Sequence, residues 1–227
     1  MEKNFRHEYK FLISPNAARL LKMRLPHIMS RDTHAGPTGQ YTIRSLYFDD
    51  PNYNAFRDKV DGVDNRTKYR IRCYNGDTTQ CRLERKEKKG HLTRKTGQSI
   101  TCRDAQALQN RLFSGCPDHR EGLCEELRLL CASAGLKPMV LVDYDRTPFI
   151  CRDGNTRITL DENLRTRPFC TDLTASPQAM IPLLERNQVI LEVKFDDFLP
   201  GYLADAISDI PKANMAISKF ALCMNLT

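Results

Sequence analysis

Polar side chains, nearly all of them ionised, recur at every second position in five separate segments of this 227-residue chain. The segments are Arg6-x-Glu8-x-Lys10, Lys68-x-Arg70-x-Arg72, Arg82-x-Glu84-x-Lys86-x-Lys88, Arg157-x-Thr159-x-Asp161 and Glu192-x-Lys194. Guanidinium groups form paired hydrogen bonds with phosphate oxygens and lysine adds point charge, so these cations together would bind a chain of phosphates. Cations held side by side repel one another, and a bound polyanion would relieve that repulsion. The few carboxylates would either pair with the cations or hold Mg²⁺ or Mn²⁺ against phosphate oxygens.

The overall charge agrees with an anionic partner without choosing one, because 35 Lys and Arg against 28 Asp and Glu leave a net charge of +7. The nine cysteines are odd in number and include no C-x-x-C pair, so the sequence supports neither a zinc site nor a disulfide framework. We expect reduced, mostly buried thiols. The chain has no long apolar run and no signal-like start, so we expect a cytoplasmic protein with no membrane segment.

Period-two alternation predicts about eight strands, mostly antiparallel. They are expected near 5–11, 41–48, 68–73, 81–88, 92–100, 139–151, 157–161 and 189–195. Asn75-Gly76-Asp77 predicts a tight hairpin between two of them. Amphipathic helices are expected at about 15–25, 102–114, 177–187 and 214–225, and a further helix is opened by Asp118-x-x-Glu121 and ended by Gly135 and Pro138. We expect one α+β domain spanning 1–227.

The alternation leaves two orientations open for the charged side of this sheet. If helices cover the apolar side, the charged side faces either bulk water, as in an open antiparallel sheet, or the inside of a closed barrel. The first arrangement needs no function for the charges. The second would make the lumen a cage for a polyanion.

Eight segments together resemble the VTC-type polyphosphate polymerase domain of the triphosphate tunnel metalloenzyme superfamily, whose relatives include the CYTH phosphatases and cyclases. They follow one another in the order of that family, from residue 5 to residue 220. The segments are Phe5-Arg6-His7-Glu8-Tyr9-Lys10-Phe11, Ile43-Arg44-Ser45-Leu46-Tyr47-Phe48-Asp49, Lys68-Tyr69-Arg70-Ile71-Arg72, Leu83-Glu84-Arg85-Lys86, Tyr144-Asp145-Arg146-Thr147-Pro148-Phe149, Arg157-Ile158-Thr159-Leu160-Asp161, Leu191-Glu192-Val193-Lys194-Phe195 and Ser218-Lys219-Phe220.

The resemblance implies an eight-stranded antiparallel β-barrel, the triphosphate tunnel, with helices packed outside. It also implies a metal-dependent transfer of the γ-phosphoryl group of ATP to inorganic polyphosphate, with Mn²⁺ or Mg²⁺ as cofactor and no nucleic-acid partner. The phosphates would be gripped by the catalytic residues Arg70, Arg72, Lys86, Arg146, Arg157 and Lys219. The implied substrate-binding residues are Lys10, Glu8, Glu84, Lys194 and Ser218, and the implied metal ligand is Glu192. Either Arg94 or Lys95 would line the tunnel as well, since the spacing there leaves the choice open.

Two other functions compete with the polymerase. A tunnel enzyme could hydrolyse triphosphate or cyclise ATP, but the CYTH members usually carry Glu-x-Glu-x-Lys in the first strand, whereas this chain has a single glutamate there, Glu8. A non-catalytic polyphosphate- or RNA-binding module would expose aromatic rings for base stacking. The chain has no Trp, and Tyr9, Tyr69 and Phe195 alternate with the charged residues, so we expect these rings in the core.

Overall fold

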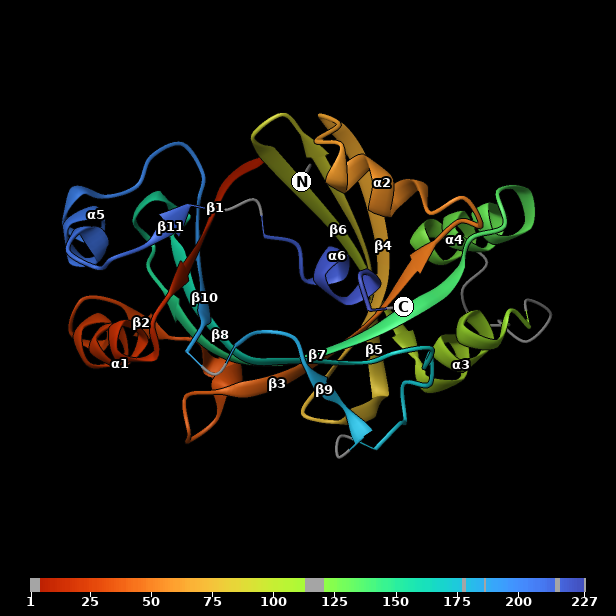
Figure 1. Ribbon diagram of the computed structural model, residues 1–227, viewed down its shortest axis with the longest axis horizontal. Helices are drawn as coiled ribbons and strands as arrows, with labels where there is room; N and C mark the ends of the chain where they lie inside the picture. The colour runs from red at the N-terminus through yellow and green to blue at the C-terminus, as the bar shows by residue number, and fades with distance from the viewer. Residues whose placement is uncertain (1–4, 113–120, 177–178, 186, 215–216, 227) are drawn as a thin grey trace.

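The computed structural model describes residues 5–112, 121–176, 179–185, 187–214 and 217–226. Its eight long strands are β1 (Arg6–Ile13), β3 (Tyr41–Asp49), β4 (Asn65–Tyr74), β5 (Asp77–Lys89), β6 (Leu92–Thr101), β7 (Lys137–Ile150), β8 (Arg157–Arg167) and β10 (Val189–Phe195). They hydrogen-bond antiparallel in the order β7-β3-β4-β5-β6-β1-β10-β8, and β8 pairs again with β7. The ring of strands is therefore closed (Figure 1), and the predicted α+β barrel of eight antiparallel strands is confirmed.

Shorter elements surround this ring. The two-residue strands are β2 (Ser30–Arg31), which pairs with β7, β9 (Ile181–Pro182), which pairs with β8, and β11 (Ala213–Asn214), which pairs with β1. The helices in the described ranges are α1 (Pro15–Arg24), α2 (Asn54–Val60), α3 (Cys102–Asn110), α4 (Gly122–Ser133), α5 (Gly201–Ser208) and α6 (Lys219–Met224). Across these ranges, every helix is too short or too polar to traverse a lipid bilayer.

Two apolar layers cover the outside of the barrel. Helices α3 and α4 pack on β5 and β6 through a buried cluster that includes Leu108 and Leu127. Helices α1 and α5 lie on the other side, where Leu21 and Leu203 pack with Leu191 of β10. Figure 1 shows the two helix pairs at opposite ends of the molecule. On β1, β4, β5 and β10 the apolar side chains therefore face outward, as the alternation predicts.

The hairpin between β4 and β5 fixes which residues share a face. Asn75 and Gly76 have φ angles of +51° and +73°, as a two-residue type I′ turn requires, so the predicted hairpin is confirmed. The turn places Arg70 opposite Glu84 and Lys68 opposite Lys86. Because side chains alternate with a period of two, Arg70, Arg72, Glu84 and Lys86 point to the same side of the sheet.

Contacts between side chains of strands that are not neighbours in the sheet show that the charged side faces the inside of the barrel. Arg72 on β4 donates a hydrogen bond to the Tyr144 hydroxyl on β7, across the intervening β3. Lys86 on β5 donates to Glu8 on β1, across β6. Such contacts require side chains to converge inside the ring, since outward side chains of a closed barrel diverge. The charged face lines the lumen and is not the solvated face of an open sheet.

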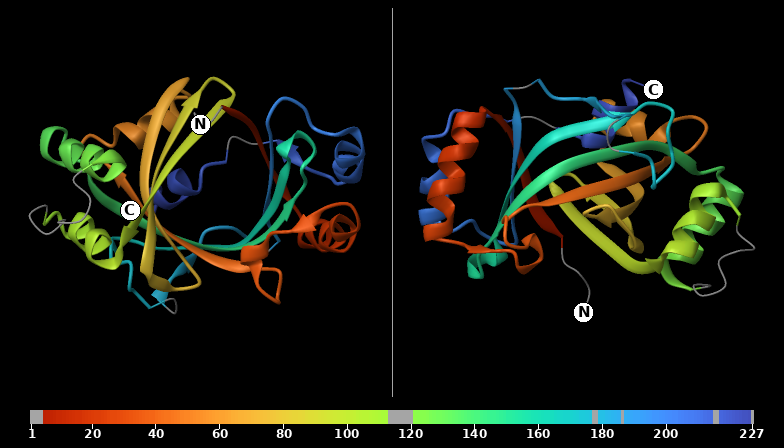
Figure 2. Two further views of the ribbon diagram at one scale, coloured as in Figure 1. Left: turned by 180° about the vertical axis from the view of Figure 1, so that it is seen from behind. Right: turned by 90° about the horizontal axis from the view of Figure 1, so that it is seen from below.

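One helix lies inside the barrel rather than outside it. Helix α6 packs against β7 and β8, and its Phe220, Cys223 and Met224 join a cluster with Val142 and Tyr144, which occupy inward positions of β7. Both views along the barrel show α6 within the ring of strands (Figures 1 and 2). The apolar residues of α6 thus fill part of the lumen. The charged residues line the part of the lumen that α6 leaves open.

Two helix predictions are wrong in these described residues. No helix spans 181–185, because Ile181 and Pro182 instead extend the sheet along Thr166 and Arg165 of β8. The predicted helix at 214–225 begins only at Lys219, since β11 pairs with β1 just before it. In both places an available strand edge outweighs the weak local preference for helix. Residues 177–178, 186 and 215–216 lie outside the described ranges.

The other helices differ from expectation at their ends. Helix α3 stops at Asn110 because Arg111 adopts a left-handed φ of +58°. Helix α4 begins after Glu121, whose side chain makes no capping hydrogen bond, and the proposed opening residue Asp118 lies outside the described residues. Gly135, with φ +70°, follows the end of α4 as predicted. Helices α2 and α5 were not anticipated, because they are short and weakly periodic.

Candidate functional site

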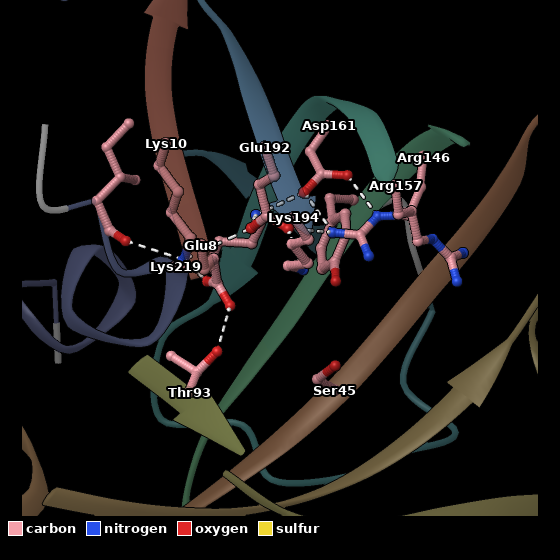
Figure 3. Close-up of polar contacts among 12 residues, drawn as sticks. Glu8, Lys10, Ser45, Thr93, Arg146, Arg157, Asp161, Glu192, Lys194 and Lys219 are labelled. Atoms are coloured by element: carbon pink, nitrogen blue, oxygen red, sulfur yellow. Dashed lines mark hydrogen bonds and ion pairs between the residues drawn. The ribbon is translucent and has the colours of Figure 1, made fainter. Parts of the chain in front are cut away.

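Glu192 is the centre of one wall of the lumen. Its Oε2 lies 2.7 Å from Lys194 Nζ and 3.1 Å from an Arg146 guanidinium nitrogen, and its Oε1 lies 3.1 Å from Lys219 Nζ and 3.5 Å from Lys10 Nζ. Burial alone would raise the pKa of this carboxyl group, but the surrounding cations outweigh burial and hold it well below its usual range. The carboxylate is therefore ionised, and four predicted site cations converge on it (Figure 3).

Asp161 is a second carboxylate on the same wall that the sequence analysis did not assign to the site. Its two oxygens each accept a 2.6 Å hydrogen bond from the Arg146 guanidinium, and Lys219 Nζ lies 2.6 Å from Oδ2. Asp161 is fully buried, and Arg146 and Lys219 are each 6% exposed. Arg146 and Lys219 are therefore interior cations rather than surface ones. The alternation Arg157-x-Thr159-x-Asp161 was the available signal.

Glu84 organises the opposite wall. Arg70 lies 2.7 Å from Glu84 Oε2, Arg72 lies 3.6 Å from the same oxygen, and Lys95 Nζ lies 2.7 Å from Oε1. Burial raises the pKa of Glu84, but these cations hold it well below its usual range. Arg70 also donates a 2.7 Å hydrogen bond to the Tyr47 hydroxyl. Two guanidinium groups are thus fixed before any ligand arrives.

Glu8 lies between the two walls, beside the short pairing of β1 with β6 that forms one seam of the barrel. Strands β1 and β6 pair only through Arg6 with Thr93 and His7 with Leu92. Beside this seam, Lys86 Nζ lies 2.8 Å from both oxygens of Glu8, and Lys10 Nζ lies 3.2 Å from Oε1. The seam therefore depends on ion pairs inside the tunnel as well as on backbone hydrogen bonds.

The structure shows whether Arg94 or Lys95 lines the tunnel, a choice that the sequence spacing left open. Lys95 faces inward to Glu84. Arg94 faces the other way, where it forms an ion pair with Glu87 and lies over the Phe5 ring. The pairing of Lys86 with Lys95 and of Glu87 with Arg94 in the β5–β6 register gives this result directly. Lys95 is the tunnel residue.

The remaining predicted residues lie at the margin of these clusters. Arg157 forms a 2.7 Å ion pair with Asp32 and donates a 2.9 Å hydrogen bond to the Tyr41 hydroxyl, so its described contacts do not include the Glu192 cluster. Ser218 is the N-cap of α6, and its hydroxyl accepts a hydrogen bond from Lys68 Nζ at 3.3 Å. Lys68 was absent from the predicted site, although it shares the inward face of β4 with the two arginines.

The expectation for the aromatic residues is met in part. Tyr69 and Phe195 are buried in the two outer clusters. Tyr9 is 43% exposed and stacks on Phe195 at a centroid distance of 5.8 Å, so its predicted core position is wrong. Other rings, Tyr47 and Tyr144, lie in the tunnel and offer hydroxyl groups to Arg70 and Arg72. Of the three rings whose core position was predicted, Tyr9 is therefore the exposed one, and it stacks on a buried ring rather than on a further exposed one.

The partly buried amine of Lys68 leads to a prediction about stability and pH. Burial, together with the neighbouring Arg66, Lys10, Lys86 and Lys59, lowers its pKa to about 7. Between that value and the ordinary 10.5, the unfolded chain holds a proton that the folded chain lacks, so stability rises with pH. In urea unfolding between pH 7 and 8.5, Lys68→Met should reduce this slope by up to about 1.4 kcal/mol per pH unit.

The control for this measurement is Lys22→Met, which removes the same charge from the outer helix α1, where Lys22 pairs with Glu162. It should keep the slope of the unaltered protein. A slope unchanged by Lys68→Met would show that this amine remains protonated in the folded state over the whole range.

Comparisons with known proteins agree with this tunnel. Among curated proteins, no sequence match was found. A Hippeastrum structure, described as an adenylyl cyclase candidate with a dominant triphosphatase activity, is 16% identical, with a TM-score of 0.59 over 97% of this chain and 95% of that chain. An adenylate cyclase candidate from Bacillus halodurans is 16% identical, with a TM-score of 0.52 over 92% and 89% of the two chains. A Pyrococcus horikoshii protein is 13% identical, with a TM-score of 0.55 over 96% and 99%.

These structural likenesses show that this chain shares its fold with the three proteins. The sequence itself matches a family model, that of the VTC domain, over residues 5–227. The match includes every strand of the barrel, the two charged walls and the inner helix α6. The chain belongs to the VTC domain family.

Proposed function

We propose that this domain is a polyphosphate polymerase that transfers the γ-phosphoryl group of ATP to a growing phosphate chain inside the barrel. The observation that carries the proposal is the composition of the lumen. Among the described residues, the four tunnel carboxylates Glu8, Glu84, Asp161 and Glu192 each contact at least two cations. The cations come from both walls, so an elongated polyanion fits the tunnel better than a compact ligand does.

The arrangement supports phosphoryl transfer without a protein nucleophile. A terminal phosphate oxygen of the acceptor is largely ionised near neutral pH, so catalysis consists mainly of positioning and charge stabilisation. Arg70 and Arg72, held by Glu84 and by the tyrosine hydroxyls, present guanidinium groups to the triphosphate. Arg146 and Lys219 on the opposite wall supply the charge that stabilises the transferring group.

The carboxylates on that wall also fit a divalent cation. Mg²⁺ and Mn²⁺ are commonly held by one or two carboxylates together with substrate phosphates. Glu192 and Asp161 are ionised, buried and share the same two cations, Arg146 and Lys219. Within the described ranges, no three His, Cys, Asp or Glu side chains are grouped to hold a metal by themselves. Glu192 and Asp161 would therefore hold it with phosphate oxygens, and the metal would neutralise charge on the phosphates.

A second reaction remains open to the same site, the transfer of the phosphoryl group to water. The observation that favours it is the likeness in fold to the Hippeastrum protein with its dominant triphosphatase activity. Against it, the first strand supplies a single glutamate, Glu8. Family membership and this first strand together favour the polymerase.

Product analysis distinguishes these reactions. The protein is incubated with ATP and Mn²⁺ or Mg²⁺, and polyphosphate is resolved on a gel beside assays of ADP and inorganic phosphate. We expect a ladder of long chains with matching ADP, lost in Glu192→Gln. Glu162→Gln, which removes an outer carboxylate paired with Lys22, should keep the ladder. Free phosphate or pyrophosphate without a ladder would contradict the polymerase and establish a triphosphatase or a cyclase.

A further inference from the structure

Lys68 continues the row of cations that begins with Arg72 and Arg70 on β4. The three residues alternate along one strand, and their side chains share the inward face. A strand rises about 3.3 Å per residue, so Lys68 lies about 7 Å beyond Arg70 along the strand. The row is therefore longer than the pair of guanidinium groups that the resemblance assigns to the triphosphate.

Lys68 differs from its neighbours in its partners. Arg70 pairs with Glu84, and Lys86 pairs with Glu8. Within the part of the chain that the structure describes, Lys68 forms no ion pair. Its Nζ donates a hydrogen bond to Ser218 Oγ at 3.3 Å and lies 4.5 Å from the centre of the Phe220 ring. The lumen thus supplies this cation with a hydroxyl and an aromatic face but no negative charge.

The groups that face Lys68 from the neighbouring elements are cations. They are Arg66 on its own strand, Lys86 on β5, Lys10 on β1 and Lys59 on α2, and each acts to lower the Lys68 pKa. Helix α6 contributes only Ser218 and Phe220. The repulsion also reaches Lys59, whose pKa is lowered first by burial and then by Arg66, Lys88 and Lys10. An anion bound here would be stabilised by several cations at once.

We propose that Lys68 binds a phosphate group of a linear chain beyond the phosphates held by Arg70 and Arg72, and that it thereby sets a preference for chains longer than a triphosphate. The inference rests on the proposed phosphate-chain function and adds a subsite to it. The ligand class is linear inorganic polyphosphate. Lys68 is a binding residue in this proposal, because its ammonium group touches the chain directly.

A purely structural role makes a different prediction. If Lys68 only fixed α6 through Ser218, its replacement would disturb Lys219, which is on the same helix and contacts Glu192 and Asp161. Short and long chains would then lose affinity together. If Lys68 binds a distal phosphate, only the longer chain loses affinity.

The test measures binding of tripolyphosphate and of a linear chain of roughly fifteen phosphates by calorimetry at pH 7. Loss of a charged hydrogen bond in a partly buried site corresponds to a loss of affinity of about tenfold or more. Lys68→Met should show that loss for the long chain and less than about threefold for tripolyphosphate. Lys68→Arg, which keeps a cation, should restore most of the long-chain affinity. Lys22→Met, on the outer helix α1, is the matched charge control.

The outcomes separate this subsite from the proposed function. Equal loss for both ligands, or no loss for either, overturns the Lys68 subsite. Selective loss for the long chain supports it even if the protein makes no polyphosphate, in which case the polymerase alone is wrong. If the unaltered protein binds neither ligand, both proposals are overturned. As a second readout, long-chain binding at pH 8 should take up protons, and Lys68→Arg should take up fewer, since phosphate would raise a lysine pKa of about 7.

Discussion

Replacing Arg70 by alanine is expected to lower kcat/KM for ATP by about 100- to 1000-fold, the range typical for loss of one preorganised group that stabilises transition-state charge. Arg70 is fixed at 2.7 Å from Glu84 and donates at 2.7 Å to the Tyr47 hydroxyl, so its guanidinium group is positioned before the substrate binds. Alanine removes both the charge and the paired donors that suit phosphate oxygens. Turnover is measured as ADP release and as polyphosphate formed.

Arg85→Ala is the matched control for that variant. Arg85 lies on β5 directly opposite Tyr69, one position away from the Arg70 pair, but it points outward and pairs with Glu126 at 2.6 Å. The two variants remove the same side chain at neighbouring positions of one hairpin. Arg85→Ala should stay within a few-fold of the unaltered protein. Comparable losses in both variants would mean that the hairpin fold, and not the tunnel charge, limits activity.

The inward residues were predictable from sequence to the extent that they follow strand alternation. A period of two, together with the Asn75-Gly76 turn, places Arg70 and Glu84 on one face without knowledge of the barrel. Alternation does not reveal that β8 returns to β7, which is the contact that closes the ring. The distinction between an open sheet and a tunnel therefore required either the resemblance or the structure.

The site residues that escaped the sequence analysis depend on tertiary contacts. Asp161 looked like the end of an ordinary strand, but β8 continues to Arg167 and puts this carboxylate under Arg146. Helix α6 showed only a short apolar stripe, which gave no sign that it lies within the barrel and buries Lys219. For both Asp161 and Lys219, the sequence did not show which element would lie beside the residue in the folded protein. Local preference for strand or helix does not supply that information.

Asp161→Asn is expected to destabilise the ligand-free protein by about 3–5 kcal/mol, the range for removing one partner of a buried ion pair. Asp161 is fully buried and ionised, because the Arg146 and Lys219 cations outweigh the effect of burial and lower its pKa. An asparagine keeps the shape but leaves these two cations to share Glu192, which already contacts Lys194 and Lys10. Thermal unfolding should shift down by about 10 °C.

Glu162→Gln supplies the comparison, because Glu162 adjoins Asp161 in the chain but pairs on the outside of the barrel with Lys22. Lys22 and Glu162 are both partly open to water, where an ion pair contributes about 0–1 kcal/mol, so this variant should unfold almost as the unaltered protein does. Tripolyphosphate should recover part of the loss in Asp161→Asn, since a bound anion supplies the negative charge that the two cations have lost and stabilises the state that binds it. Equal stability of the two variants, with no extra stabilisation by the anion, would show that Arg146 and Lys219 do not need Asp161 and that the lumen tolerates its excess positive charge.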